Sequence, residues 1–302
     1  MLVIVFGAGF VGKPLCALLE NEGHQVVPVT RHQDDGLATC DITDAKALER
    51  LREEFGQADA MIHCAASSGR GSGDRVEHYR AVYLEGCRNI IRVFSPARLV
   101  FAGSSSVYGQ TDGSRVDESS CAEPLTETGR ILLEAEELVL GYGGSVARLA
   151  GIYGPGRSYL LKRYLEGVSR IDGDNPEDEG RWINQVHRED AASALAHLVG
   201  MSDHSGIYNV CDETPFRQRA CYEQFDRRFG LGIPDVQLPD KGRPRGWSNK
   251  RVSCQSLRSA GWHPRYPSYF DALDNDQDLL PSITAQVSPG GEAAKGWRNA
   301  DG

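Results

Sequence analysis

A chain of 302 residues is long enough for one large α/β domain, or for such a domain with a smaller lobe. Its hydrophobic fraction of 40% and charged fraction of 25% are ordinary for a globular protein, and a net charge of −9 argues against general binding to nucleic acid, which needs basic surface. The longest apolar runs fall far short of the roughly 20 residues that a membrane helix needs, so we expect no membrane role.

The apolar N-terminal segment, MLVIVFGAGFVG, has no charged leader and leads directly into a glycine turn. It is therefore expected to be a buried strand rather than a signal peptide. The eight cysteines are scattered, with no CxxC pair and no metal-ligand spacing. This pattern predicts reduced thiols in a cytoplasmic protein that has no metal site.

The first half of the chain alternates apolar, strand-like segments with amphipathic, helix-like segments. This is the pattern of a parallel sheet that helices cover on both faces. We expect strands at 2–6, 25–30, 37–40, 59–64, 98–103 and 145–149, and helices at 11–21, 44–54, 76–95 and 127–140. The predicted fold is α/β, a Rossmann-type doubly wound parallel sheet with a small C-terminal substrate lobe.

The chain divides into three predicted parts. Residues 1–160 form the nucleotide-binding domain, to which a strand and a helix return from 183–215, and residues 161–280 form the smaller lobe that covers the substrate. From 281 to 302 the sequence is rich in Gly, Ser and Pro and has few apolar residues. Because such a segment buries too little surface to offset its chain entropy, we expect a disordered tail.

A GxGxxG motif, formed by Gly7, Gly9 and Gly12, follows the first strand and opens the first helix. In this context the first glycine makes the tight turn, the second lets a pyrophosphate approach, and the third lets the helix pack closely. The helix N-terminus, with Phe10 and Val11, supplies N–H groups and partial positive charge to the phosphates. The motif predicts a dinucleotide site.

The end of the second strand bears on which dinucleotide binds. An NAD-binding protein usually carries an acid here for the ribose hydroxyls, whereas this chain has Thr30 and Arg31. An arginine beside a hydroxyl favours a 2′-phosphate, so NADP is predicted in preference to NAD. A solvated loop arginine is the alternative, and the nearby Asp34 and Asp35 weaken the assignment.

Two further strand ends are expected to contact the cofactor. Asp41, after the third strand, is placed to accept a hydrogen bond from the adenine amino group, with the Ile42 backbone beside it. The fourth strand ends in Cys64, Ala65 and Ala66, whose small side chains let the backbone pass close to a cofactor.

These segments, in this order, resemble the extended short-chain dehydrogenase/reductase family, which includes sugar-nucleotide epimerases and dehydratases. The resemblance covers roughly residues 1–275, and it is closest to an atypical subgroup that keeps the glycine motif and lacks most of the usual active-site residues. The matching landmarks are GAGFVG at 7–12, CDIT at 40–43, HCAA at 63–66, SSSVYG at 104–109, RLAGIYGPGR at 148–157 and VHREDAA at 186–192.

The resemblance implies a mechanism that uses a Ser or Thr, a Tyr and a Lys. The serine, which orients the substrate oxygen and lies against the cofactor, corresponds to Ser104. The tyrosine and lysine positions, however, hold Thr128 and Leu132. Because an aliphatic hydroxyl does not ionise usefully near neutral pH, Thr128 is a poor substitute acid.

Other residues are candidates for the missing roles. Tyr108 follows Ser104 closely in sequence and is a candidate acid, although the family's tyrosine here is usually structural. Ser105, Arg130 and Arg157 are candidate substrate-binding residues, and a solvated helix-end arginine is the alternative for Arg130. His63 and His187 are expected to be packed core residues.

Two functions follow from these observations. One is an NADP-dependent oxidoreductase, or an epimerase/dehydratase relative, that acts on a small polar metabolite. The other is a cofactor-binding sensor or partner-binding protein without turnover, which the missing Tyr–Lys pair suggests. The family often forms homodimers through two long helices, here 76–95 and 127–140, so a homodimer is a further expectation.

Overall fold

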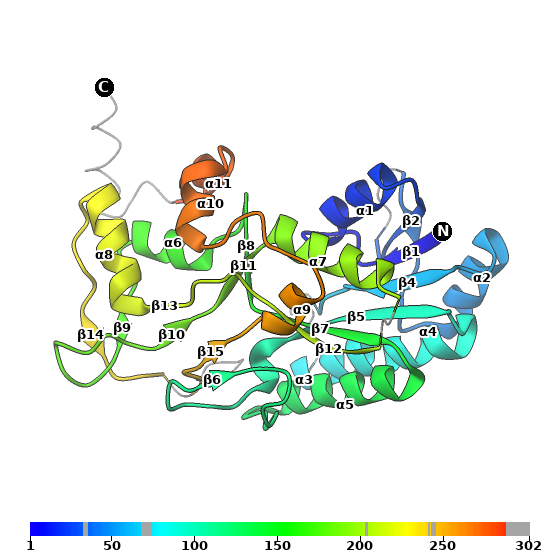
Figure 1. Ribbon diagram of the computed structural model, residues 1–302, viewed down its shortest axis with the longest axis horizontal. Helices are drawn as coiled ribbons and strands as arrows, with labels where there is room; N and C mark the ends of the chain where they lie inside the picture. Colours follow the sequence, from blue (N-terminus) through cyan, green and yellow to red (C-terminus); the bar gives the residue numbers. More distant parts are fainter. Residues whose placement is uncertain (33–35, 68–73, 203–204, 241, 243–245, 288–302) are drawn as a thin grey trace.

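A computed structural model shows a molecule with two hydrophobic cores, one around a large sheet and one in a smaller lobe (Figure 1). It describes residues 1–32, 36–67, 74–202, 205–240, 242 and 246–287.

Seven parallel strands form the central sheet, in the order β12-β7-β5-β4-β1-β2-β3. They are β1 (Leu2–Phe6), β2 (Gln25–Thr30), β3 (Ala38–Thr39), β4 (Ala60–His63), β5 (Arg98–Ser104), β7 (Ser145–Leu149) and β12 (Gly206–Val210). Val3 pairs with Val26 of β2 on one side and with Ala60 of β4 on the other. The strand order reverses there, and ligands bind at such a reversal in open α/β sheets. The predicted fold class is confirmed.

Helices cover both faces of this sheet (Figure 1). One face carries α1 (Gly12–Asn21) and α7 (Arg188–Gly200), and the other carries α2 (Ala45–Phe55), α3 (Arg75–Tyr79), η1 (Arg80–Glu85), α4 (Gly86–Phe94) and α5 (Glu127–Tyr142). Because both faces are covered, β1 at the middle of the sheet is apolar along its length, and Val3 to Phe6 are at most 1% exposed. Side-chain caps set some helix starts, as where the Thr126 hydroxyl accepts from the Gly129 amide of α5 at 3.2 Å.

The segment 76–95, expected to be one regular helix, contains a turn of π-helix, η1, between α3 and α4. In this turn the carbonyl of Val82 accepts a hydrogen bond from Nε2 of His63 on β4, at 2.9 Å. A side chain that engages a helix carbonyl disturbs the regular hydrogen-bond ladder, and π-turns are frequent at functional sites. The sequence periodicity predicts a helix in this segment, but it does not predict the π-turn.

The smaller lobe has an aromatic core, which includes Tyr153, Tyr164, Phe225 and Tyr269. Its elements are short: β8 (Gly151–Tyr153), α6 (Tyr159–Leu165), β9 (Ile171–Asp172), β10 (Trp182–Ile183), β11 (Gln185–His187), β13 (Phe216–Arg217), α8 (Gln218–Phe229), β14 (Val236–Gln237), α10 (Tyr269–Asn275) and α11 (Leu279–Thr284). These strands pair only two at a time, so ring packing rather than a continuous sheet holds the lobe together.

Two of the predicted boundaries differ from the structure. The tail expected from 281 begins inside helix α11, where Ile283 is fully buried and Val287 is 3% exposed, so these apolar residues are anchored in the aromatic core. Residues 288–302 lie outside the described residues. The segment assigned to the lobe also returns to the main core, through β15 (Arg251–Val252), which pairs with β6 (Arg115–Val116), and through α9 (Gln255–Ser259).

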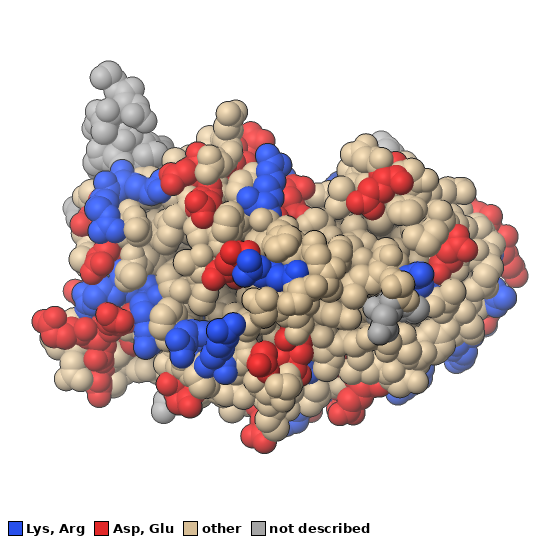
Figure 2. Space-filling model, viewed as in Figure 1, with Lys and Arg blue, Asp and Glu red and all other residues tan. Residues whose placement is uncertain are grey.

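The surface of the described residues carries charges of both signs. Basic and acidic side chains are interspersed on the face shown in Figure 2. No helix in this part of the chain is both long enough and apolar enough to cross a membrane. Leu133 and Leu138 of α5 pack against the main core, and a homodimer through α4 and α5 stays a prediction.

Candidate functional site

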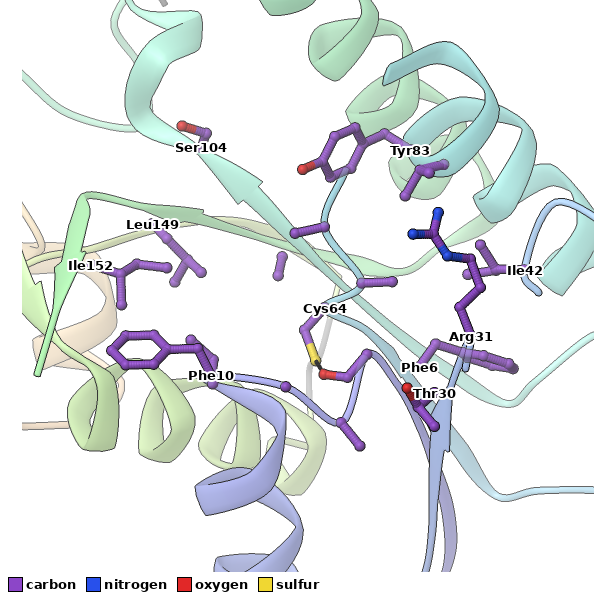
Figure 3. Close-up of a pocket in the computed structure, with 18 of the residues that line it drawn as sticks. Phe6, Phe10, Thr30, Arg31, Ile42, Cys64, Tyr83, Ser104, Leu149 and Ile152 are labelled. Atoms are coloured by element: carbon purple, nitrogen blue, oxygen red, sulfur yellow. Dashed lines mark hydrogen bonds between the residues drawn. The ribbon is translucent and has the colours of Figure 1, made fainter. Parts of the chain in front are cut away.

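A cavity of about 390 Å³ lies at the carboxyl ends of the central strands, where the strand order reverses (Figure 3). Most of the residues expected at a nucleotide site line it. They are Gly7, Gly9, Phe10, Val11, Thr30, Arg31, Asp41, Ile42, Cys64, Ala65, Ala66 and Ser104, and Arg157, a candidate substrate-binding residue, lines the cavity as well. The fold therefore brings together the carboxyl ends of strands that are far apart in the sequence.

The glycine turn is shaped by close backbone contacts. Gly7 has φ +101°, and a Cβ there would lie 2.4 Å from the Ala65 nitrogen; a Cβ at Gly12 would lie 2.1 Å from the Gly7 oxygen. Only glycine fits either position. The turn is held against β2 because the amides of Gly7 and Ala8 both donate to the Val29 carbonyl, at 2.9 and 3.0 Å.

Gly9 differs from the other two glycines in a way that fits a bound diphosphate. A Cβ at Gly9 would approach only the Gly7 oxygen, at 4.0 Å, so the space above it is open. Val11, which caps α1, contributes no side-chain hydrogen bond to the helix. The positive end of α1 thus faces the cavity without an acidic cap, as phosphate binding at a helix N-terminus requires. Gly12 does not line the cavity and acts from beneath the turn.

The residues after β2 form the part of the cavity expected to hold the adenosine. Thr30 and Arg31 both line it, with Arg31 exposed and its Nε 3.3 Å from Nε2 of His32. His32 is a lining residue that the sequence reasoning missed. Asp34 and Asp35, which weaken the preference for NADP, lie outside the described residues.

Asp41 lines the same part of the cavity. Its Oδ1 accepts hydrogen bonds from the amide and the hydroxyl of Thr43, at 2.9 and 2.8 Å. These bonds fix the carboxylate. An adenine amino group would have to donate to the acceptor positions of the carboxylate that Thr43 does not occupy.

Cys64 links the end of β4 to the glycine turn. Its Sγ donates to the carbonyl of Gly7 at 3.4 Å. Burial raises the pKa of the Cys64 thiol to about 12, so it stays protonated and serves packing rather than nucleophilic chemistry. The small residues Ala65 and Ala66 follow it along the cavity wall.

Ser104 lies at the opposite end of the cavity, at the last position of β5 (Figure 3). Its Oγ accepts from the Ser106 amide at 3.2 Å, which caps the short helix η2 (Ser105–Val107). Ser104 and Ser106 line the cavity, whereas Ser105, predicted to bind substrate, is not among its lining residues. Ser105 differs from its two neighbours because the turn directs successive side chains in different directions.

The structure removes Tyr108 from the candidate acids. Its side chain is fully buried, and its hydroxyl donates to the Asp117 carbonyl and the Asn209 side chain, at 2.9 and 3.0 Å. Burial raises its pKa, and the Arg148 guanidinium carbon lies 4.8 Å from its ring centroid. The ring packs in the core, so its role is structural.

Helix α5 brings no ionisable group to the described cavity wall. Thr128 is 7% exposed, with its hydroxyl 3.2 Å from that of Thr126, and it does not line the cavity. Arg130 is exposed and also lies outside the lining. Leu132, which the family resemblance places at the lysine position, does line it. The predictions for Thr128 and Arg130 are therefore not supported by the geometry.

Arg157 and Phe10 form one rim of the cavity. The Arg157 guanidinium carbon lies 5.2 Å from the Phe10 ring centroid, and that of Arg188 lies 5.6 Å from the same ring. Arg157 is exposed and reaches the cavity from the loop after β8.

No sequence motif marks as site residues the lining residues that come from α3, η1 and the segment from the end of β7 into β8. They include Tyr79, Val82, Tyr83, Leu149, Ala150 and Ile152. The periodicity of 76–95 places Val82 and Tyr83 on a buried helix face, but no short motif marks them as site residues. The hydroxyl oxygen of Tyr83 accepts from the Ser67 amide at 3.3 Å.

Both histidines singled out in the sequence pack in the interior. Burial lowers the pKa of His63 to about 4 and that of His187 to about 4. The Nε2 of His187 lies 3.0 Å from Oδ2 of Asp276, away from the cavity. Within the described ranges, no group of three or more His, Cys, Asp or Glu side chains has the arrangement of a metal site.

The sequence is similar to known proteins along most of its length. Residues 3–211 match the NAD dependent epimerase/dehydratase family. The chain is 29% identical over 286 residues to Protein YeeZ of Escherichia coli K12, which covers 88% of this chain and 96% of that protein. It is 27% identical over 271 residues to dTDP-4-keto-6-deoxy-D-glucose reductase of Streptomyces niveus, covering 87% and 86% of the two chains.

Solved structures share the fold. UDP-glucose 4-epimerase of Thermus thermophilus, in complex with NAD, aligns with a TM-score of 0.75 at 24% identity, over 94% of this chain and 98% of that one. UDP-glucose 4-epimerase of Thermotoga maritima, with UDP-glucose, aligns with a TM-score of 0.76 at 17% identity, over 95% and 100%. The arrangement of sheet and lobe is therefore shared with these sugar-nucleotide enzymes.

Proposed function

Because the chain belongs to the NAD dependent epimerase/dehydratase family, we propose that it is an oxidoreductase or epimerase-like enzyme that uses NADP(H) on a small polar metabolite. One observation carries the proposal: a single cavity contains the glycine turn at one end and Ser104 at the other. A dinucleotide whose diphosphate lies on the turn would extend toward the serine.

Each part of the cavity has a task in this proposal. The Gly9 backbone and the N-terminus of α1 hold the diphosphate, and Asp41 and Arg31 hold the adenosine half. The nicotinamide, when bound, supplies or accepts a hydride. The Ser104 hydroxyl orients the substrate oxygen by a hydrogen bond, and apolar side chains such as Leu149 exclude water from the reacting end.

The preference for NADP is supported by Arg31. Its guanidinium lies at the cavity wall beside Thr30, at the end of β2. A 2′-phosphate there would form charge-assisted hydrogen bonds with a planar guanidinium, which a 2′-hydroxyl does not match. NAD is the alternative cofactor, and several relatives of known structure are bound to it.

The alternative function is cofactor binding without turnover. It is supported by α5, from which only Leu132 reaches the described cavity wall, so the usual phenol and amine are missing. Two observations favour catalysis instead: Ser104 lines the cavity, and the family includes reductases and epimerases. The name of the Streptomyces niveus relative suggests a carbonyl compound as the substrate class to test.

The test combines binding and turnover. NADPH and NADH binding is measured by calorimetry, and NADPH oxidation is followed with a library of carbonyl compounds. We expect NADPH to bind and at least one carbonyl to be reduced, with kcat lowered about 10²-fold or more in Ser104→Ala. Ser119→Ala removes an exposed hydroxyl in the 117–120 turn and is the control.

The outcomes separate the two functions. NADPH binding without oxidation by any tested carbonyl would favour the non-catalytic protein. Turnover that Ser104→Ala leaves unchanged would contradict the placement of the reacting end. Failure to bind either coenzyme would contradict the whole proposal.

A further inference from the structure

Proton transfer at the reacting end requires a group that α5 does not supply. A hydride added to a carbonyl carbon leaves an alkoxide, whose oxygen must take a proton from a positioned acid. The hydroxyl of Thr128 is buried against Thr126, and Leu132 is apolar. An acid for this step has to come from another part of the cavity wall.

The helical segment that packs beside α5 brings a phenol to the cavity. Tyr83 lies in the π-turn η1, and Figure 3 shows its ring projecting from the helix, with the hydroxyl directed toward the side of the cavity on which Ser104 lies. The other lining tyrosine, Tyr79, is one turn earlier and 8% exposed, with its hydroxyl 3.5 Å from Nη2 of Arg75. We propose that Tyr83 is the catalytic acid of this enzyme and replaces the phenol that position 128 lacks.

The surrounding side chains fix the orientation of the Tyr83 ring. It lies parallel to the His63 ring, with centroids 6.3 Å apart and an interplanar angle of 16°, and edge-on to Phe101, with centroids 6.3 Å apart. His63 in turn donates to the Val82 carbonyl of the π-turn at 2.9 Å. A ring held by two aromatic neighbours on the sheet keeps one direction, as a proton donor must.

The hydroxyl oxygen of Tyr83 also has a suitable partner. The Ser67 amide donates to it at 3.3 Å. A hydrogen bond donated to a phenol oxygen stabilises the phenolate that remains after proton transfer. This backbone N–H thus does part of what the family's lysine does, without adding a full charge.

The step balances as carbonyl reduction, and it rests on the proposed function. The carbonyl carbon receives the two electrons and the proton of the hydride, which oxidises the reduced nicotinamide. The Tyr83 O–H bond breaks while an O–H bond forms on the substrate, giving an alcohol and a phenolate, and water returns the proton to the phenolate. Without a lysine the phenol is suited to donating its proton rather than to removing one, so reduction is the favoured direction.

The test is Tyr83→Phe, which keeps the ring and removes only the hydroxyl. We expect kcat for NADPH-dependent carbonyl reduction to fall about 10²–10⁴-fold, with the Kd for NADPH within about threefold of the wild-type value. The alkaline limb of the wild-type pH profile should disappear. Tyr142→Phe, which removes a phenol bonded to the Pro96 carbonyl on the other end of α5, is the matched control and should leave kcat unchanged.

A second measurement does not depend on turnover. The ultraviolet difference titration of wild type against Tyr83→Phe reports the ionisation of this phenol alone. Addition of NADP⁺ should move its midpoint to lower pH, because the nicotinamide charge favours a nearby phenolate. An unmoved midpoint would place the phenol away from the nicotinamide and overturn the proposal.

The failures of the two proposals are distinguishable. Normal reduction by Tyr83→Phe, together with its loss in Ser104→Ala, would overturn the assignment of Tyr83 and leave the enzyme function standing. A rise in the NADPH Kd that matches the loss of kcat/KM would make Tyr83 a binding residue and overturn its role as acid. Absence of any carbonyl reduction by the wild-type protein would overturn both.

Discussion

The two ends of the cavity are built from different parts of the chain. At the glycine turn, backbone atoms determine the shape, since a Cβ at Gly7 or Gly12 would lie within 2.5 Å of another residue's backbone. At the end near β5, the side chains of Ser104, Tyr83 and Leu132 determine it. The glycine turn tolerates almost no substitution. At the end near β5, side chains can be substituted, and the chemistry changed, while the backbone stays the same. This difference allows the glycine turn to keep its shape while α5 presents only Leu132 to the described cavity wall.

The largest effect is expected from Gly12→Ala at the backbone end. The added Cβ would lie 2.1 Å from the Gly7 oxygen, so the helix must move away from the turn. We expect unfolding free energy to fall by roughly 4–5 kcal/mol, or soluble protein to be lost. Urea unfolding measures this.

Gly9→Ala is the matched variant for that prediction. Its Cβ would approach only the Gly7 oxygen, at 4.0 Å, so stability should stay near that of the wild type. The methyl group would occupy the space for the diphosphate, and NADPH affinity should fall. If both variants had the same stability, the backbone would not be the determinant of this end.

The next effect concerns the ion pair beneath the reacting end. Glu136 of α5 and Arg148 of β7 are 0% and 3% exposed, and Arg148 donates to the carboxylate from Nε and Nη2 at 3.0 and 2.7 Å. Glu136→Gln would leave a buried guanidinium without its counter-charge, at a cost of about 3–5 kcal/mol in unfolding free energy. Chemical denaturation of the double variant Glu136→Leu with Arg148→Met should show recovery of much of that loss. A single variant as stable as the wild type would show that α5 is held by apolar packing alone.

A pH effect is expected from His63, which connects β4 to the π-turn. Burial lowers its pKa to about 4 in the folded state, below the ordinary value of about 6.5. The unfolded state therefore binds more protons, and stability present above pH 6.5 is lost as pH falls toward 4. At pH 5 the loss from this residue is about 2 kcal/mol.

His63→Gln isolates that contribution, because an amide still donates to the Val82 carbonyl and does not titrate. The fall in unfolding free energy between pH 7 and pH 5 should be about 2 kcal/mol smaller in the variant. His187, whose pKa is lowered in the same direction by burial, is present in both proteins and cancels. Equal pH dependence of the two proteins would exclude a neutral, buried His63.

The smallest effect is expected from Arg31→Ala at the adenosine part. Arg31 is exposed, so solvent weakens its interaction with a phosphate. We expect the Kd for NADPH to rise about tenfold, which is about 1.4 kcal/mol, and the Kd for NADH to stay the same. Arg50→Ala, which removes a guanidinium that is 68% exposed on α2, is the calorimetric control. An equal loss for both coenzymes would mean that Arg31 does not discriminate between them.

The shape of the glycine-turn end could be predicted from the sequence because its determinants are local. Strand, glycine turn and helix follow one another within residues 2–21, and each glycine has a backbone reason to be there. The reacting end could not be predicted in the same way. Tyr108 and Thr128 are candidates in the sequence because they are near Ser104 or at a family position, and the structure buries both. Tyr83 reaches the cavity from a π-turn whose Val82 carbonyl accepts a hydrogen bond from His63, 19 residues earlier in the chain.

The sequence alone determined the parallel sheet and the glycine turn that follows its first strand, because periodicity and glycine spacing are properties of the chain itself. The tertiary structure decided which side chains face the cavity. That depends on the direction of each Cα–Cβ bond after helices and strands have packed, and on irregular turns that short-range pattern does not specify.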